Sequence, residues 1–195
     1  MPKPQWKPWR LWPALPAGKD REKIIVTFIL SLILMALLFL IIWVAVSLVQ
    51  NPKLFTTAPK DIQATVVPHK ERFPGARILG WFLLLLCAAL LLGTFIYAGW
   101  DGKQNSYGFW QFFWRFLAML YLWKAFDIIC LDWFLLTKSH FFQHYYPETE
   151  GCAGYHSFGF NRKEQITRIV LFPFVSLLLA GICTFLCERE CYYDR

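Results

Sequence analysis

The chain has 195 residues, of which 57% are hydrophobic, 19% are aromatic and only 17% are charged. An ordinary soluble domain is about 45–50% apolar and about 25% charged, so the composition argues against that class and favours a membrane protein built as one unit. The net charge of +7 suits the anionic face of a bilayer. No basic cluster with a nucleic-acid-binding signature is present in the sequence, so we expect no nucleic acid among the partners.

The first segment, residues 1–23, is a basic tail rich in Pro and Trp. It holds four prolines before residue 14, and this density of proline excludes a helix there. Trp rings interleaved with Lys and Arg suit the headgroup layer of a membrane; a disordered tail is the alternative. We expect residues 24–195 to form a single membrane domain.

Residues 24–49 contain no charged side chain and predict the first membrane span. At about 1.5 Å per residue the helix is about 39 Å long, enough to cross a hydrocarbon core of about 30 Å with some tilt. A signal-peptide core has only about 7–15 residues, so we expect this helix to be retained. Residues 50–77 follow as a polar loop whose four prolines exclude a long helix. Residues 78–98 predict the second span.

A tight polar turn is predicted at residues 101–106, and so short a link makes the second and third spans antiparallel neighbours. The third span is predicted at residues 109–136. Asn161 has capping-box spacing to a glutamate three residues later, which predicts a helix start. The fourth span is predicted at residues 166–187, with Pro173 as a kink.

These runs predict an all-α fold, a polytopic integral membrane protein with a bundle of four transmembrane helices. We expect it in the cell membrane (plasma or inner), with both termini on one side. The positive-inside rule does not decide which side, because nine basic residues fall on each side of the membrane. The first helix, with six basic residues before it and five after it, favours cytoplasmic termini.

The third predicted span carries charge at its middle, in Lys124, Asp127 and Asp132. A lone charge at that depth is expensive, so we treat the three residues as a candidate intramembrane polar site. Lys124 and Asp127 are three residues apart and can pair on one helix. At about 100° per residue, Asp132 lies about 80° round the helix from Lys124, on the other side from Asp127, so Lys124 can reach either carboxylate. Arg115 lies near the end of the run, where its side chain can snorkel to the interface.

Two interpretations of this charged span remain open. The functional one is a path or site for a proton, an ion or a polar substrate. The structural one is an ion pair that fixes the orientation of the helix, or a helix shifted so that Asp132 lies at the interface.

The loop after the third span holds candidate metal ligands. His140 and His144 have the i,i+4 spacing by which a helix presents two imidazoles to one metal ion, and Cys152 and His156 follow. However, this HxxxH lacks the glutamate of HExxH and matches no metalloprotein motif. We therefore expect no cofactor, with a metal site at these four residues as the alternative.

Five of the six cysteines lie in or beside the predicted spans, and only Cys152 lies in a clear loop. This placement argues against a disulfide framework. Cys183, Cys187 and Cys191 are four residues apart and share a helix face. We expect them to pack between helices, with acylation or metal binding as the alternative.

Two stretches together resemble a known kind of protein. The first is DIICLDW at residues 127–133, and the second is YPETEG at residues 146–151, followed by a Gly-Tyr pair and a Gly-Phe pair. The pattern is similar to that of small uncharacterised bacterial integral membrane proteins, in which the same features precede the last span. The resemblance covers residues 127–160 and implies the same four-span architecture, without an activity.

No nucleophile elbow and no phosphate-binding loop occurs in the sequence, so the catalytic residues, if any, are unknown. The leading hypothesis is a non-enzymatic membrane protein, either an accessory or structural component or a small carrier. The alternative is a membrane-embedded enzyme acting on a lipid or polyprenyl substrate, with Asp132, Glu148, Glu150 and the histidines at the bilayer edge. Expected partners are the lipid bilayer and either another membrane protein or a second copy of the chain.

Overall fold

A computed structural model describes residues 19–55, 58–67, 69–157 and 159–193. Within these residues every regular element is a helix and no strand occurs, which confirms the all-α prediction. Most of the predicted N-terminal tail lies outside the described residues. The tail ends earlier than predicted, because the first helix already begins at Lys19.

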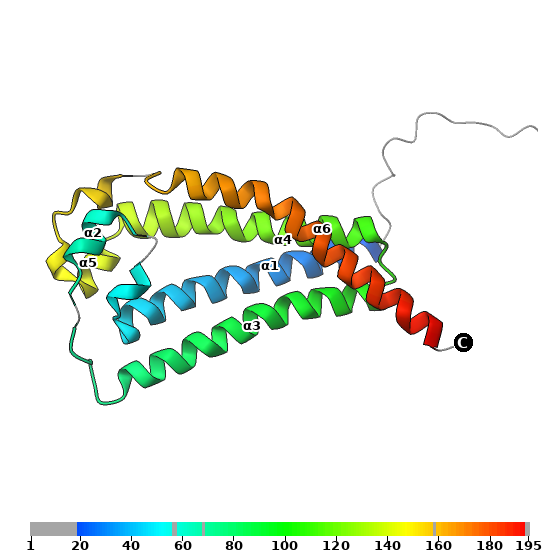
Figure 1. The fold of residues 1–195 in the computed structure, drawn as a ribbon, viewed down its shortest axis with the longest axis horizontal. Coiled ribbons are helices and arrows are strands. Elements are labelled where there is room, and N and C mark those ends of the chain that lie inside the picture. Colours follow the sequence, from blue (N-terminus) through cyan, green and yellow to red (C-terminus); the bar gives the residue numbers. More distant parts are fainter. Residues whose placement is uncertain (1–18, 56–57, 68, 158, 194–195) are drawn as a thin grey trace, which may run out of the picture.

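Four long helices form the bundle, and two of them continue as π-helix (Figure 1). They are α1 (Lys19–Val44) with the π-helical turn η1 (Ala45–Val49), α3 (Ala76–Gln104), α4 (Phe109–Phe126) with the π-helix η3 (Asp127–Lys138), and α6 (Arg162–Tyr193). Figure 1 shows that α1 begins and α6 ends at the same end of the bundle. We call this the terminal end.

Three helices in the described part of the chain are long and apolar enough to cross a membrane: Arg21–Val49, Ala76–Gln104 and Arg162–Leu186. The first, second and fourth predicted spans fall on them. The third predicted span, residues 109–136, is a continuous helix but is not among these three, and it carries four charged side chains.

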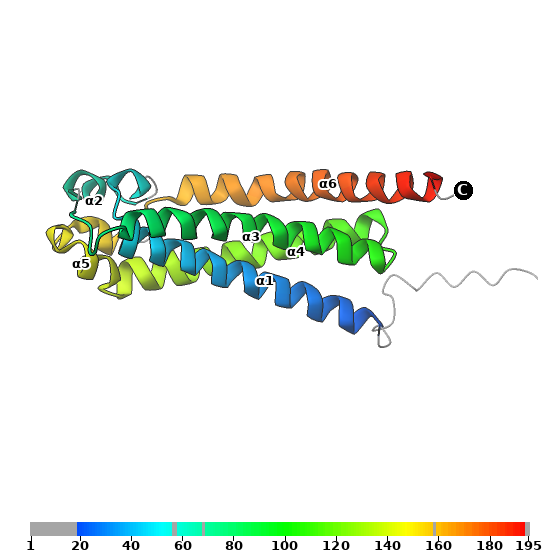
Figure 2. The same ribbon diagram turned by 90° about the horizontal axis from the view of Figure 1, so that it is seen from below.

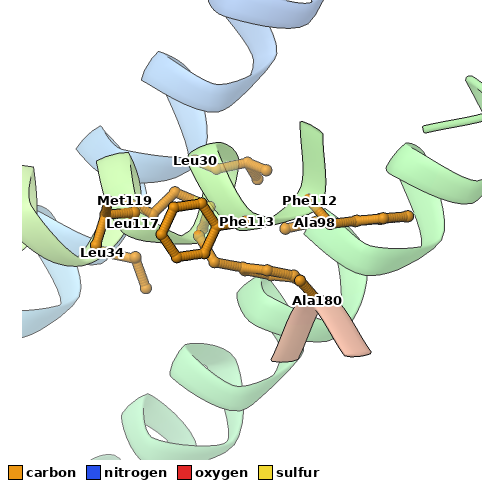
Figure 3. Close-up of a cluster of buried hydrophobic side chains, with 9 residues drawn as sticks. Leu30, Leu34, Ala98, Phe112, Phe113, Leu117, Met119 and Ala180 are labelled. Carbon is orange, nitrogen blue, oxygen red and sulfur yellow. The ribbon is translucent and has the colours of Figure 1, made fainter. Parts of the chain in front are cut away.

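The long helix that is not among these three, α4, is the most enclosed. Eight of the 18 residues of α4 are buried. In the most apolar stretches of α1, α3 and α6, only 22%, 17% and 11% of the residues are buried. Figure 3 shows side chains of α1, α3 and α6 meeting Phe112, Phe113, Leu117 and Met119 of α4. The charged side chains of α4 can therefore face protein rather than lipid.

The turn between α3 and α4 differs from the prediction. We expected a polar turn at residues 101–106, but α3 continues through Gln104 and the turn lies at residues 105–108. The helix extends because Gly102 packs against the next helix, where an added Cβ would lie 2.3 Å from Cε1 of Phe112. Asp101 is thereby held on the helix, facing α4.

At the other end of the bundle, the two longer loops pack on each other and form a small helical layer (Figure 2). We call this layer the cap and define it as the described residues of 50–75 and 139–160. Its helical elements are η2 (Pro52–Phe55), α2 (Lys60–Thr65), α5 (Phe141–Tyr145), η4 (Pro147–Thr149) and η5 (Ala153–His156). The first loop contains only short helices, as its prolines predict.

Two predicted features of α6 can be located. The helix begins at Arg162, directly after the predicted cap residue Asn161. Pro173 lies inside one continuous helix, and Figure 1 shows that α6 changes direction partway along its length.

Candidate functional site beneath the cap

The helix carrying the candidate polar residues changes from α to π at Asp127. A π-helix closes its hydrogen bonds over five residues, so residues five apart come close together around its axis. As a result Asp127 and Asp132 line the same pocket. The α-helical spacing predicted opposite sides of Lys124 for these two carboxylates; in the structure both line one pocket on a π-helix.

Lys124 and Asp127 form an ion pair inside the bundle, between Nζ of the lysine and Oδ2 of the aspartate. Lys124 is only 4% exposed. Both residues also line an adjoining cavity shared with Arg168 of α6. The charge of Lys124 is therefore matched where it is buried, which removes much of the cost of placing it there.

Asp132 has a different partner. Nε2 of Gln165, on α6, donates a hydrogen bond of 2.6 Å to Oδ2 of Asp132. Among the described residues, Asp132 has no cation within ion-pair distance. The amide oxygen Oε1 of Gln165 is buried and, within the described part of the chain, meets no donor. The result is a carboxylate held by one amide, with an unsatisfied acceptor beside it.

The pocket that these carboxylates line lies between η1, η3 and the cap, and its cavity volume is about 120 Å³. Apolar side chains make up most of its wall. Among the described lining residues, Asp127 and Asp132 are the only carboxylates. The full lining is Ile42, Ala45, Val46, Leu54, Ala58, Ile62, Asp127, Leu131, Asp132, Leu136, Phe142, Tyr155 and Phe160.

Contacts between loops distant in sequence hold the cap over this pocket. The N–H of Gly154 donates to Oδ2 of Asp61 at 2.6 Å, and an added Cβ on Gly154 would lie 2.4 Å from Oδ1 of the same aspartate. Glu148 Oε1 lies 2.9 Å from Nε2 of His69 and accepts a 3.3 Å hydrogen bond from the N–H of Val67. Sequence reasoning missed Asp61 and His69, because their partners lie 93 and 79 residues away.

Glu148 and Glu150 were candidates for chemistry at the bilayer edge. The structure places Glu148 in the contact that joins the two loops, and Glu150 is exposed. Partial burial acts to raise the pKa of the Glu148 carboxyl, but the hydrogen bonds from His69 and from the backbone outweigh it, so the net pKa is lowered.

We expect the Glu148 contact to weaken in acid. A lowered folded pKa means that its contribution to stability is complete above the ordinary value of 4.5 and is lost as the pH falls through the lower folded value. Hydrogen exchange of the Val67 amide, corrected for its intrinsic rate, should accelerate about threefold across this range, a modest effect because the group is partly solvated. Glu148→Gln should show the faster exchange already at pH 7, and Glu150→Gln should not. Equal protection in Glu148→Gln and the parent would contradict this expectation.

The four candidate metal ligands do not gather into a site. Among the described residues, no group of three or more His, Cys, Asp or Glu is placed to hold a metal ion. His140, His144 and His156 are exposed, and Sγ of Cys152 lies 3.7 Å from the hydroxyl of Thr65 in α2. This loop contributes to the cap instead.

Among the described cysteines, Cys87, Cys130 and Cys152 are free thiols. Cys183 lies against α3, where an added Cβ on Gly99 would be 3.0 Å from its Sγ. This close approach fits the predicted packing role. The side chains of Cys187 and Cys191 lie outside the described part of the structure.

A second polar cluster lies toward the terminal end. Nη2 of Arg115 is 2.7 Å from Oδ2 of Asp101, and Nη1 donates to the carbonyl of Ala98 at 3.0 Å. The Arg115 side chain is only 2% exposed. The expectation that it snorkels to the interface is therefore wrong: the extension of α3 past the predicted turn brings a carboxylate to it.

Comparisons with known proteins found no matching family model, no similar curated protein and no similar solved structure. The chemistry of the pocket must therefore be inferred from its own geometry.

Proposed function

We propose that the protein is a non-enzymatic, four-span integral membrane protein that binds part of a membrane-derived amphipathic molecule in the pocket beneath its cap. The observation that carries this proposal is the pocket itself, a largely apolar cavity at one end of the bundle with Asp127 and Asp132 in its wall. Its cavity volume of about 120 Å³ is below the about 300–1,000 Å³ of pockets that enclose a whole ligand, so it has room for only part of such a molecule. We place the protein in the cell membrane with both termini cytoplasmic.

The enclosure of α4 supports its role as the fourth crossing. The continuous helix Phe109–Lys138 packs against α1 and α6, and its buried charges are paired within the protein. A charged helix of this kind can cross a bilayer because its costly groups do not face hydrocarbon. Crossing at this point also accounts for the beginning of α1 and the end of α6 at one end of the bundle.

The arrangement of polar groups favours a protein that binds a ligand over a carrier that moves one through the bundle. Arg115 and Lys124 lie on the same helix, but Phe116, Leu117 and Met119 between them belong to the apolar core. The described side chains thus offer no continuous polar route between the Arg115 cluster and the pocket. A carrier would need a rearrangement of this core, whereas an accessory component would not.

The alternative is a membrane-embedded enzyme acting on a lipid or polyprenyl substrate. One observation favours it: two carboxylates converge on one apolar pocket, an arrangement that can serve acid–base chemistry. Turnover that is lost in both Asp127→Asn and Asp132→Asn would establish this alternative.

Filling the pocket tests the binding proposal. We expect the purified protein to retain lipid from mild detergent, and Ala45→Phe to reduce retention about tenfold because its ring occupies space in the pocket wall. Ala64→Phe is the matched control, since Ala64 is exposed on α2 and does not line the pocket. Native mass spectrometry counts the lipids retained. Equal retention by the two variants would contradict the proposal.

A further inference from the structure

The charges around the pocket do not cancel. Lys124 neutralises Asp127, and Arg168, which lines the adjoining cavity, lies 3.8 Å from Glu164. Asp132 is left with the neutral amide of Gln165 as its partner. The pocket therefore carries one carboxylate that forms no ion pair with a described cation, in a wall that is otherwise mainly apolar.

Within the described part of the structure, the Asp132 carboxylate accepts one side-chain hydrogen bond. The amide of Gln165 donates one hydrogen bond to Asp132. Its own buried oxygen accepts none in the described part of the structure. An unsatisfied buried acceptor is costly, and hydrogen bonds to a charged group are stronger than those between neutral groups. Gln165 is not among the residues that line the pocket, so a ligand there would meet the Asp132 carboxylate, and a cation with N–H groups would match that carboxylate best.

We infer that the pocket selects a lipid whose headgroup carries a primary ammonium, with the ammonium on Asp132 and apolar chain against the wall of the pocket. This inference rests on the proposed function, because it names the ligand class of the same pocket. A primary ammonium supplies both the missing charge and three N–H donors. A trimethylammonium supplies charge without any N–H, and an anionic headgroup meets the negative charge of Asp132.

The first test uses the unaltered protein. It is exchanged into an equal mixture of phosphatidylethanolamine, phosphatidylcholine and phosphatidylglycerol with identical chains, and native mass spectrometry measures which lipid it retains. We expect phosphatidylethanolamine to be retained about tenfold over the other two, the effect of one charge-assisted hydrogen bond. Retention should fall stepwise as the ethanolamine nitrogen is methylated once, twice and three times. Equal retention across the methylation series would overturn the inference.

The second test uses Asp132→Asn, which keeps the size of the side chain and an oxygen that can accept from Gln165. We expect this variant to retain lipid but to lose the preference for phosphatidylethanolamine. Glu150→Gln makes the same chemical change at an exposed position of the cap and should keep the preference. A preference that survives in Asp132→Asn would overturn the role of Asp132.

The failures of the two proposals are distinguishable. Lipid that is retained by the parent and lost in Ala45→Phe, but without selectivity for the headgroup, would leave the pocket function standing and remove the ammonium inference. A parent protein that retains none of the three lipids would contradict both.

Discussion

Replacing Lys124 by Met, or Asp127 by Leu, is expected to destabilise the folded protein by about 3–5 kcal/mol, because each change leaves a buried charge without its partner. Lys124 is 4% exposed and its ammonium pairs with Asp127 inside the bundle. The double variant should recover a good part of the loss, since it leaves neither charge behind. Folded yield in detergent and unfolding by sodium dodecyl sulfate in mixed micelles measure the effect.

Lys138→Met is the matched control, because Lys138 is exposed at the end of the same helix. It should leave stability within about 0.5 kcal/mol of the parent. Single variants at Lys124 and Asp127 that are as stable as the parent would mean that these charges already reach water, and the buried-pair interpretation would then be wrong.

The second large effect is expected at Arg115. Arg115→Met should also cost about 3–5 kcal/mol, because it leaves the Asp101 carboxylate between α3 and α4 without its cation. Arg115→Lys should not restore full stability. The guanidinium reaches Asp101 and the carbonyl of Ala98 through two different nitrogens, and an ammonium lacks that planar fork.

The same unfolding assay measures the Arg115 variants. Arg162→Met is the control, because Arg162 is exposed at the start of α6, and it should behave like the parent. An Arg115→Lys variant with full parental stability would contradict the role given to the planar guanidinium. An Arg115→Met variant as stable as the parent would contradict the buried ion pair with Asp101.

The long helices and one ion pair could be predicted from the sequence. Apolar runs located three helices, and the spacing of Lys124 and Asp127 indicated their pairing, because both signals are local. The charged residues of the third predicted span also indicated that this helix, α4, would be buried among the others. The local sequence pattern was sufficient to predict features that lie within one helix.

Features that depend on distant or irregular contacts escaped prediction. Asp127 and Asp132 line one pocket on a π-helix, and a sequence read with the α-helical period places these residues apart. The cap contacts of Asp61 and His69 join the two loops across most of the chain. Asp101 was expected in a turn, but it lies on α3, which continues past Gly102 where that glycine packs on Phe112.

The central claim is that α4 and η3 together cross the membrane as the fourth span, with the cap on one face and the terminal end on the other. Cysteine-accessibility labelling in sealed vesicles tests it with four exposed positions, Arg21→Cys and Asn105→Cys at the terminal end and Lys70→Cys and Glu150→Cys in the cap. The parent protein supplies the background of its own thiols. We expect the first two positions to label from one face and the last two from the opposite face. Labelling of Asn105→Cys and Glu150→Cys from the same face would show that the charged helix does not cross, and would contradict the account.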